Sequence, residues 1–144
     1  MTTDTNTRAM DINEKLTSLL GGNPFDIQLI GKTVDRSWGK PWEHDLWCVF
    51  LKGHPGMEFN YRTGMGLRKN GKPVKPSLAD ILYSLHADSY YTEYSLDELA
   101  KEMEITVPSK AVEVHAAIHR SAAIFRKAVP AAVREQVEAL LQDY

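Results

Sequence analysis

The chain has 144 residues, of which 43% are hydrophobic and 25% are charged. These values are typical of one globular domain and exclude a disordered chain, which would contain far fewer apolar residues. The net charge of −2 does not favour a dedicated nucleic-acid binder. The lone cysteine, Cys48, excludes an intramolecular disulfide and favours a reducing compartment.

No apolar run approaches the roughly 18 residues of a membrane span. The polar N-terminus also lacks the basic-then-apolar layout of a signal peptide. We therefore expect a cytoplasmic protein that does not engage a membrane.

The N-terminal segment divides into a tail and a first helix. Residues 1–9 are polar and rich in threonine, and we expect them to form a flexible tail. Residues 10–144 are expected to form a single α+β domain. Its first element is a short helix that Asp11 caps and that Gly21 and Gly22 end.

Three strands are predicted next. Residues 25–34 and 57–62 alternate between apolar and polar side chains, whereas residues 45–52 are almost continuously apolar, as in an interior strand. The Gly-His-Pro-Gly link at 53–56 has hairpin length, which predicts a three-stranded antiparallel meander. We expect the core of this sheet to centre on Leu46, Val49, Phe50 and Phe59.

Helices follow the strands, after a loop at 63–76. Ser77 and Ser95 are predicted caps, and Pro108 and Pro130 mark the starts of two further helices. Strands followed by helices, rather than alternating with them, predict an α+β fold. We expect a short N-terminal helix, a three-stranded antiparallel sheet, and then three to four helices packed on one face of the sheet.

Catalytic motifs are incomplete. Residues 66–72 match the first seven positions of a phosphate-binding loop, but Pro73 stands where a Ser or Thr would hold magnesium. His115 and His119 are four residues apart on a predicted helix without a third metal ligand at a suitable spacing. Cys48 lies within an apolar strand, and no G-x-S-x-G motif is present. We therefore expect no catalysis, no cofactor and no metal.

Charge is distributed unevenly along the chain. Residues 60–79 contain five basic residues and no acid, whereas residues 80–104 contain seven acids and one base. The acidic segment also holds a tyrosine cluster, and tyrosine brings large contact area at low entropic cost. We expect two opposed patches to bind a partner, the acidic one more strongly. The predicted binding residues are Asp88, Tyr90, Tyr91, Glu93 and Tyr94 in the acidic segment and Arg62, Arg68, Lys69 and Lys72 in the basic one.

One segment carries a family resemblance. Residues 71–88, a Lys-Pro-rich loop followed by Ala-Asp-Ile-Leu-Tyr at 79–83, are preceded by the tracts 44–47 and 59–64. This pattern resembles small proteins of unknown function that bacteriophages and prophages encode, and the similarity extends over about 45–125. The resemblance implies a mobile-element setting, in which small proteins without catalytic motifs often block a host machine.

Anti-CRISPR proteins are the group to which this setting points first. The expected function is therefore stoichiometric inhibition of a host defence complex, a protein or ribonucleoprotein such as a CRISPR effector. The alternative is a nucleic-acid-binding accessory phage protein that uses the basic loop 62–75. A third possibility is an enzyme whose site no familiar motif reveals.

Overall fold

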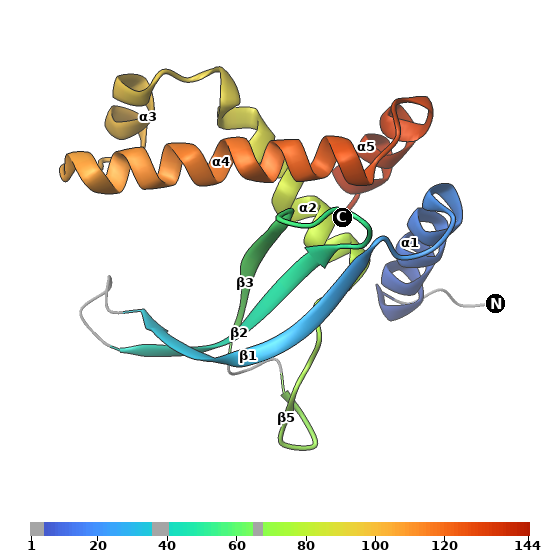
Figure 1. Ribbon diagram of the computed structural model, residues 1–144. Helices are drawn as coiled ribbons and strands as arrows, with labels where there is room; N and C mark the ends of the chain where they lie inside the picture. The colour runs from blue at the N-terminus through green and yellow to red at the C-terminus, as the bar shows by residue number, and fades with distance from the viewer. Residues whose placement is uncertain (1–4, 36–40, 65–67) are drawn as a thin grey trace.

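The computed structural model describes residues 5–35, 41–64 and 68–144, and it confirms the α+β class (Figure 1). A helix precedes a three-stranded antiparallel sheet, and further helices follow a small second hairpin. The elements are α1 (Thr5–Leu20), β1 (Phe25–Asp35), β2 (Trp42–Leu51), β3 (Glu58–Gly64), β4 (Arg68–Lys69), β5 (Lys72–Pro73), α2 (Leu78–Ser89), η1 (Tyr90–Glu93), α3 (Leu96–Glu102), α4 (Pro108–Ala128), η2 (Ala131–Val133) and α5 (Arg134–Gln142).

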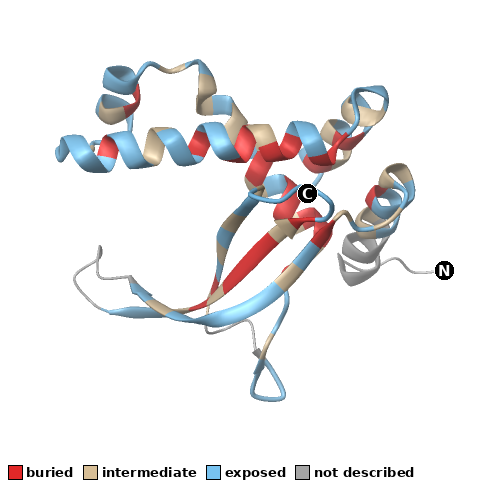
Figure 2. Ribbon diagram, in the orientation of Figure 1, coloured by how far each residue is buried: buried red, intermediate tan, exposed pale blue. Residues whose placement is uncertain are grey.

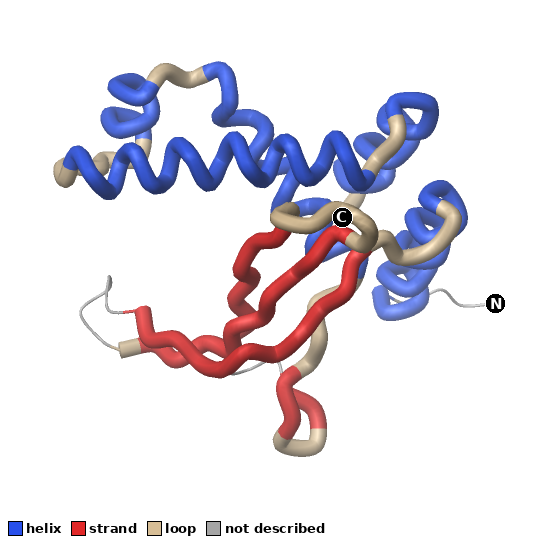
Figure 3. The backbone as a smooth tube through the Cα atoms, viewed as in Figure 1, coloured by secondary structure: helices blue, strands red, loops and turns tan. Residues whose placement is uncertain are grey.

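The sheet has the predicted order β1-β2-β3, with antiparallel pairing on both sides of β2. Val49 at its centre pairs with Ile27 on β1 and with Phe59 on β3. The β1–β2 register shifts between Leu29 and Gly31, and Gly31 has a φ of 149° that a residue with a side chain rarely adopts. Beyond this bulge the two strands continue away from the helices, as Figure 3 shows.

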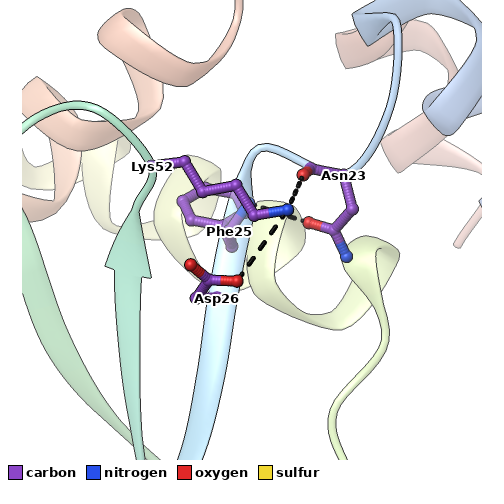
Figure 4. Close-up of polar contacts among 4 residues, drawn as sticks. All are labelled: Asn23, Phe25, Asp26 and Lys52. Carbon is purple, nitrogen blue, oxygen red and sulfur yellow. Dashed lines mark hydrogen bonds and ion pairs between the residues drawn. The ribbon is translucent and has the colours of Figure 1, made fainter.

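Polar contacts fasten the start of β1 to the end of β2 (Figure 4). The Asn23 side chain accepts a hydrogen bond from the backbone N–H of Phe25 at 2.9 Å, which turns the chain out of α1. Lys52 donates from Nζ to the Asn23 carbonyl at 3.1 Å and lies 3.8 Å from the Asp26 carboxylate. Its backbone N–H also donates to the carbonyl of Pro24 at 2.9 Å. These contacts fix the register at this edge of the sheet.

The core forms around α2, the yellow-green helix that lies between the sheet and α4 (Figures 1 and 2). Ser77 and Asp80 close a capping box at its start, with hydrogen bonds of 2.9 and 3.1 Å. The buried side chains of α2 are Leu78, Ala79, Ile81, Leu82 and Leu85. They pack with Phe25, Val49 and Leu51 of the sheet, Leu16 of α1, Ile124 and Phe125 of α4, and Val137 and Leu141 of α5.

The predicted core residues were only partly right. Val49 is fully buried and Phe59 is half-buried against the same core, whereas Leu46 and Phe50 are half-buried and lie outside it. Side chains alternate along a strand, so Val49 and its neighbours two residues away face the helices, while Leu46 and Phe50 point to the other side of the sheet. The apolar run at 46–51 hides this alternation, because nearly every position in it is apolar.

Several boundaries also differ from the predictions. The last helix, α5, begins at Arg134 after the short turn η2 and not at Pro130. Helix α1 begins at Thr5 rather than at Asp11, so it extends into the segment predicted as a tail; residues 5–10 contain neither Gly nor Pro to prevent this. The predicted loop at 63–76 contains the hairpin β4–β5. Within the described ranges, no helix combines the length and apolar character needed to cross a bilayer.

We predict that truncating Leu82 to Ala destabilises the domain by about 2–5 kcal/mol, because its side chain is fully buried in the core around α2. Phe50→Ala should cost less, although it removes more atoms, because Phe50 is only half-buried. Urea unfolding of both variants, followed by circular dichroism, measures the two differences. An equal or larger loss of unfolding free energy for Phe50→Ala would show that the core lies on the other face of the sheet.

Candidate functional site

Three tyrosines form a ring cluster in the turn that leaves α2. The centroids of Tyr90 and Tyr91 lie 5.2 Å apart with nearly perpendicular rings, and those of Tyr91 and Tyr94 lie 5.6 Å apart. The turn η1 is held by the Thr92 hydroxyl, which donates to the carbonyl of Ser89 at 2.7 Å. Tyr90 is 70% exposed, so the cluster presents aromatic area to the surface and does not simply cover the sheet.

An acidic hollow lies beside this cluster. It has a volume of about 530 Å³ and is lined by Tyr94, Glu98, Lys101, Glu102 and Glu104. The neighbouring Tyr90, partial desolvation and the Glu102 carboxylate raise the pKa of Tyr94 above its ordinary value. Hydrogen bonds from Ser95 lower the pKa of Glu98, which therefore stays ionised in the capping box of α3. The local charge is therefore negative.

The end of α3 carries acids where a helix disfavours them. The Ile105 N–H donates to the Ala100 carbonyl at 2.8 Å and the Glu104 N–H to the Lys101 carbonyl at 3.3 Å, which is the hydrogen-bond pattern of a helix that ends in a left-handed residue. That residue is Glu104, with a φ of 55°, at a position that glycine normally occupies. Glu102 and Glu104 also lie at the negative end of the helix dipole. Both features oppose stability, which favours a binding role for these acids.

We define the tyrosine–acid surface by the residues of η1, α3 and their flanks that carry these properties. They are Tyr90, Tyr91, Glu93, Tyr94, Glu98, Glu102 and Glu104. Sequence reasoning identified the tyrosines and Glu93 but missed Glu98, Glu102 and Glu104. The signal for Glu104 was available, because a helix ends there without the expected glycine.

Asp88 has a different environment from the tyrosine–acid surface. Its half-buried carboxylate faces Ser121, a buried residue of α4. Burial raises the pKa of Asp88 above its ordinary value, while the hydrogen bond with Ser121 acts in the opposite direction. Asp88 therefore joins α2 to α4, and replacing it would disturb the fold as well as any binding surface.

The predicted basic residues lie on the sheet and on the small hairpin. Arg62 is exposed on β3, on the sheet face away from α2, and Lys69 and Lys72 are exposed on the hairpin β4–β5. The side chain of Arg68 lies outside the described residues. In Figure 1 this hairpin projects from the sheet on the side away from α3 and α4. The structure therefore places the two predicted patches at opposite ends of the molecule.

The remaining candidates show no catalytic arrangement in the described part of the chain. The rings of His115 and His119 lie 4.6 Å apart, but no group of three or more His, Cys, Asp or Glu residues there can hold a metal ion. Burial and the carboxylate of Glu58, 3.3 Å from Sγ, raise the pKa of Cys48, so its thiol stays protonated. Gly66 lies outside the described residues, and Lys72 begins a strand rather than the helix that a phosphate-binding loop needs.

Comparison with known proteins adds no family to this description. No protein-family model matches the chain, and neither does any curated protein or solved structure. Function is therefore inferred from the surfaces themselves.

We predict that Glu104→Gly raises the free energy of unfolding by up to about 1 kcal/mol, because glycine adopts the left-handed conformation without strain. Glu104→Ala is the matched control, since it removes the same charge but keeps a side chain at this φ. Thermal unfolding at neutral pH compares the three proteins. If the Gly variant is no more stable than the Ala variant, the strain at Glu104 is absent in solution.

Proposed function

We propose that this chain is a non-enzymatic phage or prophage protein that acts in the bacterial cytosol. It inhibits a host defence complex, such as a CRISPR effector, by stoichiometric binding. The observation that carries this proposal is the acidic hollow beside a tyrosine cluster in which Tyr90 is exposed. The resemblance of residues 71–88 to phage-encoded proteins supports the mobile-element setting.

The chemistry of the tyrosine–acid surface favours a basic partner. A complex that grips nucleic acid lines its channel with Lys and Arg, and a protein that occupies this channel must present negative charge. Glu93, Glu102 and Glu104 are exposed and supply that charge. Bound in the channel, the chain would exclude the nucleic acid without any covalent step.

Charge and aromatic area have separate roles in this mechanism. Long-range attraction between the acids and a basic channel speeds association, and added salt weakens this effect. The tyrosines bury contact area after docking and slow dissociation, because well-packed aromatic residues contribute most of the energy in many interfaces. Of the three tyrosines, Tyr90 can bury the most additional area on binding, since it is largely exposed in the free protein.

We predict that Glu102→Lys/Glu104→Lys slows association with a purified effector complex by about tenfold or more at low salt. Lysine is favoured at the C-terminal end of a helix, so the fold should tolerate the change. Glu14→Lys/Glu43→Lys, at two exposed acids outside the tyrosine–acid surface, makes the same change in net charge and is the control. Surface plasmon resonance gives both rate constants, and a pull-down gives the stoichiometry.

Tyr90→Ala in the same assay should mainly raise the dissociation rate. The proposal fails if no defence complex is retained, or if both double variants bind equally well. Retention that depends on the basic hairpin and on co-purified RNA or DNA would favour the nucleic-acid-binding alternative instead.

A further inference from the structure

The turn of the hairpin β4–β5 has a geometry that the local sequence favours. Asn70 and Gly71 both have positive φ values, 55° and 74°, which is the two-residue turn that Asn-Gly favours. Lys69 pairs with Lys72, and Arg68 pairs with Pro73. Neither strand contributes to the buried core around α2. The fold therefore does not require this hairpin to carry any particular side chains.

The paired lysines oppose the stability of the hairpin. Directly opposite residues on an antiparallel pair point to the same face with their Cβ atoms about 5 Å apart, and like charges there are destabilising. Lys75 adds a third exposed cation shortly after β5. Among the described residues, none offers an ion-pair partner to Lys69, Lys72 or Lys75. A polyanion bound to the hairpin would relieve this repulsion.

We infer that the hairpin β4–β5 binds the sugar-phosphate backbone of a duplex nucleic acid without sequence preference. Lysine acts on phosphate as a point charge, which suits backbone contact and not base reading. Residues 68–75 contain no aromatic side chain on which unpaired bases could stack, so a single strand gains no stacking energy here. A duplex also presents phosphates at a higher density than a single strand does, so the three lysines release more counterions on a duplex.

The same absence of aromatic residues disfavours an acidic protein as the partner. Protein interfaces depend on a buried apolar or aromatic centre, and the only large apolar side chain at 69–75 is that of Val74. A hairpin with three lysines and one valine has charge but little area to bury. Phosphates need only the charge.

Helix α2 separates this hairpin from the tyrosine–acid surface. The basic segment ends just before α2 and the tyrosine cluster starts just after it, and its 12 residues span about 18 Å. This distance exceeds the Debye length of about 8 Å at physiological ionic strength. The acids therefore do not cancel the positive field at the hairpin, despite the net charge of −2.

Fluorescence anisotropy with a short labelled DNA duplex tests the inference on the full chain. Neutralising about three phosphates gives a slope of about −2.7 in log K against log salt, or about a 20-fold loss between 50 and 150 mM salt. Lys69→Gln/Lys72→Gln should remove about two-thirds of that slope. Lys110→Gln/Lys127→Gln, which removes two exposed charges from α4, should leave the slope nearly unchanged.

Competition experiments separate the possible ligands. RNA duplex should displace the DNA as well as unlabelled DNA does, because both present phosphates. The inference fails if the native protein does not bind the duplex at low salt, or if the two double variants behave alike. It fails equally if a single strand binds more tightly than the duplex, or if polyglutamate displaces the duplex at the same charge concentration. Circular dichroism confirms that each variant is folded.

Discussion

The burial of α2 is the interaction on which the rest of the structure depends. Five of its side chains are buried, so the sheet alone does not cover it, and α1, α4 and α5 supply the other walls. Polar contacts strengthen this arrangement: Asn13 of α1 accepts a hydrogen bond from the Ala79 N–H at 2.9 Å, and His86 lies 3.2 Å from Glu138 of α5. The Tyr144 hydroxyl donates to Asp80 and ties the C-terminus to the same helix. Because α2 has this fixed place, the segments before and after it emerge at opposite ends.

The segments before and after α2 each contain a feature that lowers local stability. Glu104 holds a left-handed conformation that glycine would adopt without strain, and Lys69 faces Lys72 across a tight turn. The core around α2, in contrast, has regular capping and dense apolar packing. Proteins commonly break the rules of local preference at functional sites and compensate for it elsewhere. The tyrosine–acid surface and the hairpin β4–β5 both break local preferences in this way, which an exposed surface without a binding role has no reason to do.

The fold class, the meander and the caps at Ser77 and Ser95 were predictable because they depend on short-range signals, such as the alternation of apolar and polar residues at 25–34. The buried face of β2 could not be predicted, because a run in which nearly every residue is apolar shows no alternation. The environment of Asp88 was also hidden, since Ser121 lies 33 positions later and meets it only through the packing of α2 on α4. Contacts of this kind depend on tertiary geometry that neither periodicity nor spacing encodes.

A ternary NMR titration tests the central claim most directly, namely that α2 holds two independent surfaces of opposite charge apart. Polylysine, as a stand-in for a basic partner, should shift the amide signals of residues 90–104, and a DNA duplex should shift those of residues 69–75. Adding the second ligand should leave the shifts caused by the first in place. If both ligands perturb the same residues, or if each displaces the other, the two surfaces are not separate and the account is wrong.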